Sequence, residues 1–484
     1  MRGFLKSVLL VVLVLAVGSC GSAGRVPIDP VQAQVRPNIL FVLTDDQDAA
    51  SLAEMPKVQE LLVGRGTTFD RAFVTTALCC PSRATTLRSQ YAHSHKIWTN
   101  RAPEGGFARF RNLGYEGSTV ATWLDRSGYH TGYMGKYLNE YGSFARPTTH
   151  IPPGWDRWIG YQGGPMEQSR RGAFKVNDQG RIATIDTDAE HDTDYLARKA
   201  EAYIMNRKTG NPWFLAVATN APHEPADASK RNDGSYDGRE MPRSPAFNEA
   251  DVSDKASIWR NNPLLTGECP PDYATDSGLQ CLPEADEVWR DRMESLRDVD
   301  DMVGRLHAAL QKKGFLENTY VVFTSDNGFA MYDNRVFSKG APYERAHRVP
   351  LVVRGPGVDA GRSDARLVAN IDLAPTFARW AGVRPPGFVE GRSLVPVLRD
   401  PRAPWRQRLL YEHRSGNHAY NALRTSSDEV YIEYPRTRET EYYDLAVDPH
   451  QLEANASGPP ELEAHLRRLS GCSGDTCREA DGGP

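Results

Sequence analysis

Three largely apolar runs constrain the fold more than any other feature of this chain. They cover Asn38–Leu43, Trp213–Ala218 and Tyr320–Phe323, and each run ends in polar residues. Continuous apolar runs of this length are typical of strands buried on both faces, as in a mostly parallel sheet with helices on either side. Because ligands of such sheets bind outside the carboxyl ends of the strands, we expect the three polar ends to meet at one site.

Amphipathic segments fill the gaps between these runs. The pattern predicts a helix over Ser118–Ser127 and a longer one over Glu287–Lys313, whose apolar stripe we assign to core packing. Helix and apolar strand alternate through residues 36–382, which indicates one large α/β domain there. In contrast, Pro222–Pro283 is rich in Pro, Asp, Ser and Asn and predicts long surface loops.

The pattern changes after residue 382. Three short segments have the pattern of strands separated by turns: Leu409–Glu412, Val430–Tyr434 and Tyr442–Leu445. We therefore expect a small antiparallel sheet in a C-terminal subdomain, residues 383–470. Residues 471–484 would form a tail that is loose beyond Cys477.

Residues 1–20 have the pattern of a targeting segment. Arg2 and Lys6 precede an apolar run, Val8–Val17, that is too short for a comfortable transmembrane helix. The following Gly18-Ser19-Cys20 completes a pattern that resembles a bacterial lipobox, which predicts a lipoprotein signal. An ordinary secretory signal is the alternative. Either way residues 21–35 would be a tether, and we expect an exported protein, secreted or held at the cell envelope by its N-terminal lipid alone.

The charge balance bears on possible partners, and the cysteine usage agrees with export. The 58 basic and 62 acidic residues nearly balance, so there is no long-range basic field and we expect no nucleic-acid partner. Two cysteine pairs are close in sequence, Cys269 with Cys281 and Cys472 with Cys477, and both suit local disulfides in an oxidising compartment. Zinc is the weaker alternative for these four, because no histidine lies beside them at ligand spacing.

A possible nucleophile and a possible anion site coincide in the stretch Cys79-Cys80-Pro81-Ser82-Arg83. Proline suits the first turn of a helix, so a helix from Pro81 would place Cys79 at its N-terminal end, where unpaired N–H groups favour an anion. Arg83 adds a guanidinium suited to tetrahedral oxyanions. The alternative is that both cysteines are simply small buried hydrophobic residues.

This stretch, followed by Ala84-Thr85-Thr86-Leu87, resembles the signature of the type I sulfatases. The resemblance implies an alkaline-phosphatase-like α/β fold and a first cysteine, Cys79, oxidised to Cα-formylglycine by a formylglycine-generating enzyme. In that family the hydrated aldehyde is the nucleophile, and Cys80 would stay unmodified. The chain departs from the family where Leu87 is followed by Arg88-Ser89-Gln90 instead of Thr-Gly.

Polar residues at two strand ends offer a metal site. Asp45, Asp46, Asp326 and Asn327 supply hard oxygen ligands, the set expected for Ca²⁺ or Mg²⁺. The sulfatase resemblance implies one calcium ion here, with an oxygen of residue 79 as a further ligand. The alternative is that the aspartates cap helices and that Asn327-Gly328 is an ordinary turn.

The same resemblance assigns cations that would hold the sulfate. Lys136 follows a segment similar to the second family signature, although Leu138 stands where many members have histidine. His223 matches the histidine that contacts the ester oxygen, and Lys339 matches the second sulfate lysine. The segment around Lys136, with Ile151–Trp155, is similar to N-acetylglucosamine-6-sulfatases and extracellular heparan 6-O-endosulfatases, which implies a sulfated sugar such as N-acetylglucosamine 6-sulfate, besides aryl sulfates.

These residues predict hydrolysis of sulfate monoesters. Asp45 or a neighbouring carboxylate would take a proton from the nucleophile, and His223 or Lys339 would protonate the departing alcohol. Three other interpretations remain open: a phosphate or phosphonate monoester hydrolase on the same scaffold, a catalytically silent glycan-binding protein at the cell surface, and a structural envelope protein. Three residues are candidates for lining the substrate pocket: His93, His95 and Asn100.

Overall fold

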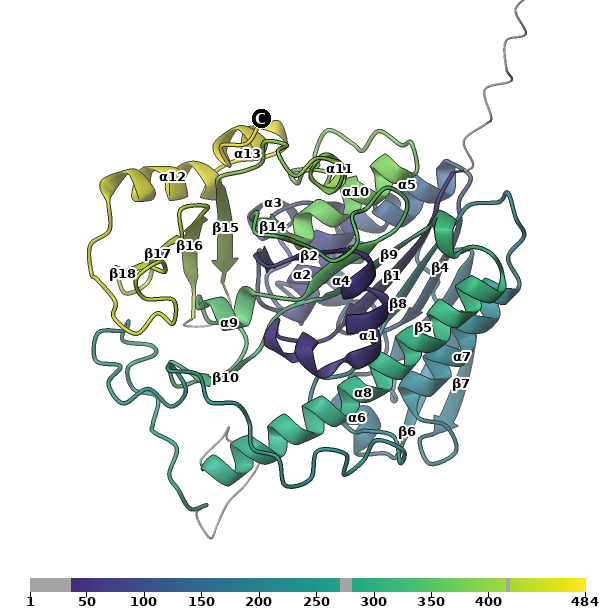
Figure 1. The fold of residues 1–484 in the computed structure, drawn as a ribbon, viewed down its shortest axis with the longest axis horizontal. Coiled ribbons are helices and arrows are strands. Elements are labelled where there is room, and N and C mark those ends of the chain that lie inside the picture. The colour runs from purple at the N-terminus through teal and green to yellow at the C-terminus, as the bar shows by residue number, and fades with distance from the viewer. Residues whose placement is uncertain (1–35, 270–280, 415–417) are drawn as a thin grey trace, which may run out of the picture. The chain divides into compact units, whose positions relative to one another are not determined.

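The computed structural model describes residues 36–269, 281–414 and 418–484 (Figure 1). The predicted targeting segment and tether lie outside the described residues. Within the described part, no helix is long and apolar enough to cross a membrane.

A ten-stranded mixed sheet forms the centre of residues 36–484. The three predicted strands are adjacent in it: β1 (Asn38–Thr44) lies between β9 (Thr319–Ser325) and β8 (Trp213–Ala218), and both pairings are parallel. The order is β13-β2-β12-β9-β1-β8-β4-β5-β6-β7. The other strands are β2 (Thr67–Phe69), β4 (His130–Gly135), β5 (Arg157–Gln162), β6 (Ala173–Asp178), β7 (Arg181–Asp186), β12 (Leu351–Arg354) and β13 (Arg362–Asp364).

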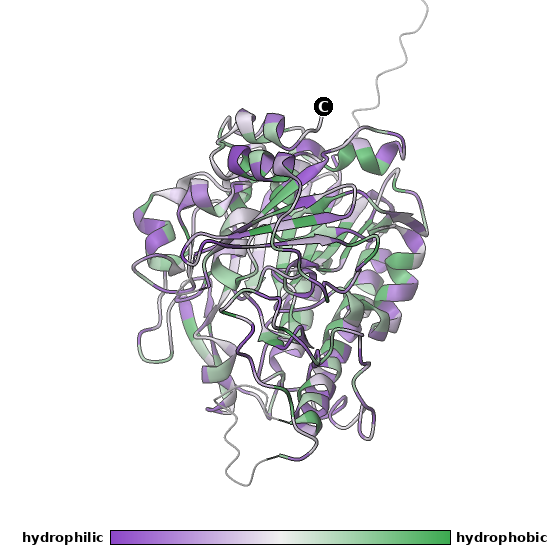
Figure 2. Ribbon diagram, turned by 90° about the vertical axis from the view of Figure 1, so that its left-hand side faces the viewer, coloured by the Kyte–Doolittle hydropathy of each residue, from purple (hydrophilic) through white to green (hydrophobic). Residues whose placement is uncertain are grey.

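Helices cover both faces of this sheet because its central strands are apolar on both sides. In β1, Ile39 and Phe41 join one hydrophobic cluster and Leu40 and Val42 join another, as the alternation of side chains along a strand requires. The first cluster includes residues of α2 (Cys79–Arg88), α4 (Gly106–Asn112), α5 (Val120–Arg126) and α10 (Leu373–Trp380). The second includes residues of α1 (Pro56–Leu61), α7 (Asp192–Met205) and α8 (Leu282–Lys312). Figure 2 shows hydrophobic residues concentrated in the strands in the middle of the ribbon.

Both predicted helices are present. The segment Ser118–Ser127 contains α5, and α8 begins five residues before the predicted Glu287. Short elements complete the unit: α3 (Ala92–His95), α6 (Pro165–Ser169), α9 (Glu344–His347), α11 (Val395–Arg399), β3 (Ala72–Phe73), β10 (Ala330–Asp333), β11 (Val336–Ser338) and β14 (Val368–Ala369). Described residues between β8 and Cys269 form neither a helix nor a strand, which agrees with the predicted loops.

The C-terminal part contains the expected small antiparallel sheet. Its four strands pair in chain order: β15 (Arg408–His413), β16 (Tyr420–Thr425), β17 (Glu429–Tyr434) and β18 (Glu439–Asp444). Together with the ten-stranded sheet, it confirms the predicted α/β architecture. Helix α12 (Pro460–Ser470) adds Leu462, Leu466 and Leu469 to the core of this part.

The last residues differ from the prediction of a loose tail. The segment after the Cys472–Cys477 disulfide belongs to a short helix, α13 (Asp475–Ala480). Asp481, which is 2% exposed, then pairs with Arg392 at 2.8 Å and with Arg406 at 3.4 Å. Tertiary ion pairs therefore hold a segment whose composition suggested disorder. Both predicted disulfides form, the second being Cys269–Cys281.

Candidate active site

The polar ends of β1 and β9 lie side by side because these two strands pair in parallel register. The main-chain N–H of Asp46 donates to Asp326 Oδ1 at 3.1 Å, and Asn327 Nδ2 donates to Asp46 Oδ1 at 2.7 Å. Asp46 has a φ of 66°, a left-handed conformation that is uncommon for residues other than glycine. These contacts hold it there, as is typical of strained residues at functional sites.

Cys79 lies beside these carboxylates as the first residue of α2. The helix begins two residues before the predicted Pro81, so Cys79 is part of its first turn. Its Sγ is 3.5 Å from Asp45 Oδ1 and 3.9 Å from Asp46 Oδ1, and its side chain is fully buried. Burial, together with the negative charge of Asp45, raises the pKa of the Cys79 thiol to about 12. At neutral pH the thiol is therefore protonated and is a poor nucleophile itself.

Three cations converge on the same carboxylates. Arg83 Nε donates to Asp326 Oδ2 at 2.7 Å, and its Nη2 is 3.3 Å from Asp45 Oδ2. Lys136 and Lys339 each donate to one aspartate of the pair, Lys136 to Asp45 and Lys339 to Asp46. Opposite charges at this range favour ionised carboxylates, so the pKa of Asp45 is lowered although burial alone would raise it.

Lys339 also contacts the cysteine. Its Nζ is 3.0 Å from Cys79 Sγ and 2.7 Å from Asp46 Oδ2. The lysine follows β11 and is preceded by Ser338, whose φ of 92° turns the chain there. A positive charge therefore lies within hydrogen-bond distance of the thiol sulfur of Cys79.

His223 completes the group from the loop after β8. Its Nε2 is 3.7 Å from Asp46 Oδ2, and its Nδ1 donates to the main-chain oxygen of Glu224 at 2.7 Å. Burial lowers the pKa of His223 to about 4, so the ring is neutral at pH 7. Because Nδ1 carries the hydrogen, the lone pair of Nε2 faces the carboxylates.

The oxygen atoms at the strand ends fit a hard divalent cation. Asn327 Oδ1 is buried without a hydrogen-bond partner, although the amide nitrogen of the same side chain is bonded. Burial and the nearby charge of Asp45 raise the pKa of Asp326 to about 6, which reflects the crowding of carboxylates. A cation that accepts only oxygen ligands would relieve both features, and calcium has that preference.

One residue of this region was missed by the sequence analysis. Arg292, on α8, is 1% exposed and donates to the main-chain oxygens of Asp46 and Pro222. Its guanidinium lies 4.0 Å from the ring centre of Phe329. The sequence signal was an arginine next to Met293 in a stripe assigned to core packing.

The three candidates for the substrate pocket have structural partners instead. His95 is fully buried and its Nε2 lies 3.0 Å from Thr85 Oγ1. His93 Nδ1 is 3.0 Å from Glu412 Oε2. Asn100 Oδ1 accepts the main-chain N–H of Cys80 at 2.8 Å, which satisfies one free N–H at the start of α2.

Comparison with known proteins identifies the family. Residues 37–383 match the family described as Sulfatase, and residues 330–470 match the C-terminal region of N-sulphoglucosamine sulphohydrolase. An N-acetylglucosamine-6-sulfatase of Capra hircus is 31% identical over 495 residues, which cover 92% of this chain and 85% of that protein. The chain belongs to the sulfatase family. The predicted family and the enzyme class, a sulfuric ester hydrolase, are confirmed.

Other sulfatases match over different shares of their length. An extracellular sulfatase SULF-1 homolog of Drosophila melanogaster is 32% identical over 410 residues, which cover 82% of this chain but only 35% of the fly protein. This sulfatase therefore spans about a third of that relative.

Solved structures show the same fold. A protein in complex with its substrate D-glucosamine-2-N,6-O-disulfate superposes with a TM-score of 0.76 at 24% identity, over 92% of this chain and 99% of that one. The phosphonate monoester hydrolase SpPMH of Silicibacter pomeroyi gives a TM-score of 0.71 at 22% identity, over 90% of this chain and 94% of that one.

Proposed function

We propose that this sulfatase hydrolyses the sulfate esters of sugars, with N-acetylglucosamine 6-sulfate as the model substrate and aryl sulfates as generic ones. The observation that carries this proposal is the position of Cys79, which lies within 3.9 Å of two carboxylates and 3.0 Å of Lys339 Nζ. The names of relatives that match most of this chain, the N-acetylglucosamine-6-sulfatases, support the sugar.

The proposal includes a Cα-formylglycine at residue 79 and one calcium ion. The thiol itself is protonated and buried, so an unmodified Cys79 does not explain catalysis. The hydrated aldehyde would supply the oxygen nucleophile. The oxygens of Asp45, Asp46, Asp326 and Asn327 would hold the calcium, whose chemistry is to neutralise and orient oxygen anions.

The side chains would stabilise the charge of the sulfate. A sulfate ester resists attack because its oxygens repel nucleophiles, and Arg83, Lys136 and Lys339 place three positive charges where that repulsion arises. Preorganised charges of this kind are usually the largest contribution to catalysis. Their positions are set before substrate arrives, because each is already paired with a buried carboxylate.

Two proton transfers complete the reaction. Asp45 is ionised, because Lys136 and Arg83 lower its pKa against the effect of burial, and it or a neighbouring carboxylate would accept the proton of the nucleophile. The leaving alkoxide needs a proton, and Lys339 or His223 would donate it. Of the two, Lys339 is the better candidate, because Asp46 raises its pKa well above the usual value, against the effect of burial, and so keeps it protonated at neutral pH.

The maturation and export of the chain are parts of the same proposal. A formylglycine-generating enzyme would act on Cys79, and the two disulfides suit an oxidising compartment outside the cytoplasm. A lipid on Cys20 would be the only membrane attachment.

Peptide mass measurement tests the proposal most directly. Trypsin releases Ala72–Arg83, and conversion replaces the thiol of Cys79 by an aldehyde, which changes the mass of this peptide. We expect the converted peptide, together with faster hydrolysis of sulfate than of phosphate esters. A cysteine-only peptide without turnover would favour the silent glycan-binding protein. Faster hydrolysis of phosphate or phosphonate esters would favour the alternative hydrolase, whose fold this chain shares.

A further inference from the structure

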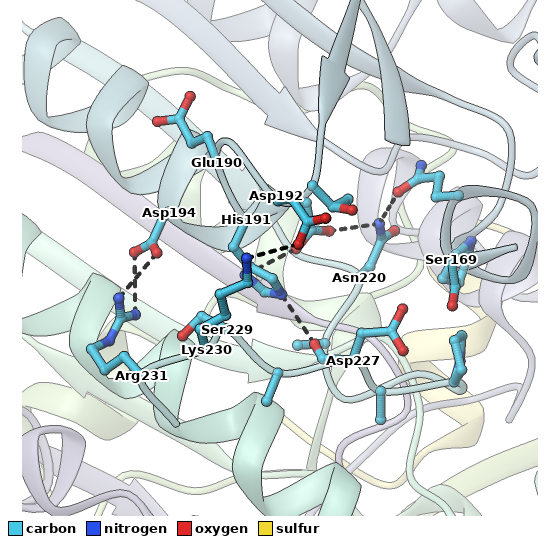
Figure 3. Close-up of a pocket in the computed structure, with 18 of the residues that line it drawn as sticks. Ser169, Glu190, His191, Asp192, Asp194, Asn220, Asp227, Ser229, Lys230 and Arg231 are labelled. Carbon is cyan, nitrogen blue, oxygen red and sulfur yellow. Dashed lines mark hydrogen bonds and ion pairs between the residues drawn. The ribbon is translucent and has the colours of Figure 1, made fainter. Parts of the chain in front are cut away.

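Figure 3 shows a cavity of about 510 Å³ beside the candidate active site. His223 is one of the residues that line it. The wall comes from α6, from the turn before α7 with the first residues of that helix, and from the loop after β8. Small-ligand sites commonly have volumes of this size. The cavity is therefore large enough for a sugar ring whose ester group reaches His223.

Two buried amides in this wall each keep one polar atom without a protein partner. Asn220 and Gln168 are 6% and 4% exposed. Asn220 Nδ2 donates to Gln168 Oε1 and to Asp192 Oδ2, both at 2.9 Å. The atoms that remain are Asn220 Oδ1, an acceptor, and Gln168 Nε2, a donor. A group that both donates and accepts, such as a hydroxyl or an acetamido group, would satisfy them at the expense of a small side-chain rotation.

The same wall is acidic. Five carboxylates line the cavity: Asp188, Glu190, Asp192, Asp194 and Asp227. Four basic side chains line the cavity as well: Lys230, Arg231, His191 and His223. The five carboxylates therefore outnumber them even when both histidines are protonated.

The pairing of these groups leaves one carboxylate free. Lys230 is 2.9 Å from Asp188 and Arg231 is 3.0 Å from Asp194. Glu190 pairs at 2.7 Å with Arg198, a residue of α7 that does not line the cavity. Figure 3 shows His191 between Asp192 and Asp227, but the bond to Asp227 goes to its main-chain oxygen. No side chain in residues 36–269, 281–414 or 418–484 pairs with the carboxylate of Asp227.

We propose that this cavity binds the sugar ring of the ester and selects against a second sulfate on that ring. The ring nitrogen substituent would be a free amine or an acetamido group, and an N-sulfate would be repelled by the carboxylates. This inference rests on the proposed function, because it concerns the same substrate. It also predicts a preference that differs from the disulfated substrate named for the similar solved structure.

Three 6-sulfated glucosamines that differ only at nitrogen test the inference: the free amine, the N-acetyl form and the N-sulfo form. We expect kcat/KM for the N-sulfo sugar to be lower by about tenfold or more than for the other two, since like charges at this range repel strongly. Asp192→Asn and Asp227→Asn should each reduce the ratio of kcat/KM for the N-acetyl sugar to kcat/KM for the N-sulfo sugar. Asp237→Asn, an exposed aspartate outside the cavity, should leave the ratio unchanged.

Binding of the same sugars to the Cys79→Ala protein, measured by calorimetry, gives a second readout that needs no turnover. Equal affinity for the three sugars, or a ratio unmoved by both cavity variants, would overturn the inference. Turnover of an aryl sulfate, which has no sugar ring, tests the sulfatase activity separately from the selectivity of the cavity. If the aryl ester is hydrolysed while the sugars are not distinguished, the proposed function stands and the cavity assignment falls. If no sulfate ester is hydrolysed, the proposed function is wrong. The relative affinities of the three sugars, measured by calorimetry, then still show whether the cavity selects against the N-sulfo group.

Discussion

The guanidinium of Arg292 donates a hydrogen bond to the main-chain oxygen of Asp46. A second bond, of 3.0 Å, goes to the main-chain oxygen of Pro222, next to His223. One buried side chain on α8 therefore fixes two loops that carry different functional groups. A buried guanidinium is kept only where its donors are well used, because removing it from water is costly.

We expect Arg292→Met to lower kcat by about tenfold or more while KM changes little, because loops displaced by an ångström lose catalytic alignment. Arg292→Lys should recover part of the loss, since one of the two hydrogen bonds can still form. Arg290→Met, on the same helix, is the control, because within residues 36–269, 281–414 and 418–484 the side chain of Arg290 bonds only to the main chain of Arg239. Steady-state kinetics with an aryl sulfate provide the measurement, and equal kinetics for the Arg292 and Arg290 variants would contradict the positioning role.

Replacing Cys79 by alanine should abolish turnover and leave the fold intact, because the side chain is small and lies in the first turn of a helix held by many other contacts. Cys80→Ala is the matched control, since Cys80 faces the hydrophobic core, and it should keep most of the activity. Circular dichroism and thermal unfolding check the fold. Near-native activity of the Cys79 variant would refute the assignment of the nucleophile.

Removal of the proposed calcium ion should lower both activity and the midpoint of thermal unfolding. The reason is that buried carboxylates at the ends of β1 and β9 would lose the cation that separates them. Chelator titration followed by calorimetry measures the effect. In Asn327→Leu, which lacks one ligand oxygen, the calcium-induced rise in the midpoint should be smaller. A midpoint of thermal unfolding that does not change when chelator is added would rule out a structural calcium ion.

Asp481→Ala should destabilise the protein by about 3 kcal/mol, because it leaves the buried guanidinium of Arg406 with one partner fewer and removes the carboxylate that pairs with the guanidinium of Arg392. The pair of half-buried Arg478 and exposed Asp475 offers the comparison. Asp475→Ala should cost less than about 1 kcal/mol. Urea denaturation gives both values, and similar costs would show that the tail is not held as described.

Acid should weaken the packing of the C-terminal sheet through His347. The ring lies between Val74 and Tyr420, with its Nε2 2.7 Å from Tyr420 Oη, and burial lowers its pKa from 6.5 to about 3. Below pH 6.5 the unfolded chain therefore binds a proton that the folded chain does not, so this contribution is complete above pH 6.5 and is lost as the pH falls towards 3. In His347→Gln the free energy of unfolding should fall less between pH 7 and 4 than in the parent. Parallel plots of the free energy of unfolding against pH for His347→Gln and the parent would contradict this role of His347.

The centre of the fold could be predicted because its strands carry their own signal. The runs that became β1, β8 and β9 are apolar on both faces, and only a buried position in a sheet suits such segments. Their polar ends could then be expected at one edge, and the structure does bring Asp45, Asp46, Asp326 and Asn327 together.

Other features depend on contacts that no local pattern encodes. Arg292 looked like part of an apolar stripe, and its importance comes from two carbonyl groups far away in sequence. The last helix is short and polar, so its order depends on Asp481 meeting Arg392. His93 and His95 looked available for substrate, but tertiary packing uses both.

The complete burial of Cys79 also limits when its chemistry can change. A side chain without solvent-exposed surface is out of reach of another protein, so a modifying enzyme would have to act on the nascent chain, before β1 and β9 close around α2. The active fraction of a preparation would then be fixed during synthesis. Adding the modifying enzyme to folded protein would not raise it, whereas co-expression would.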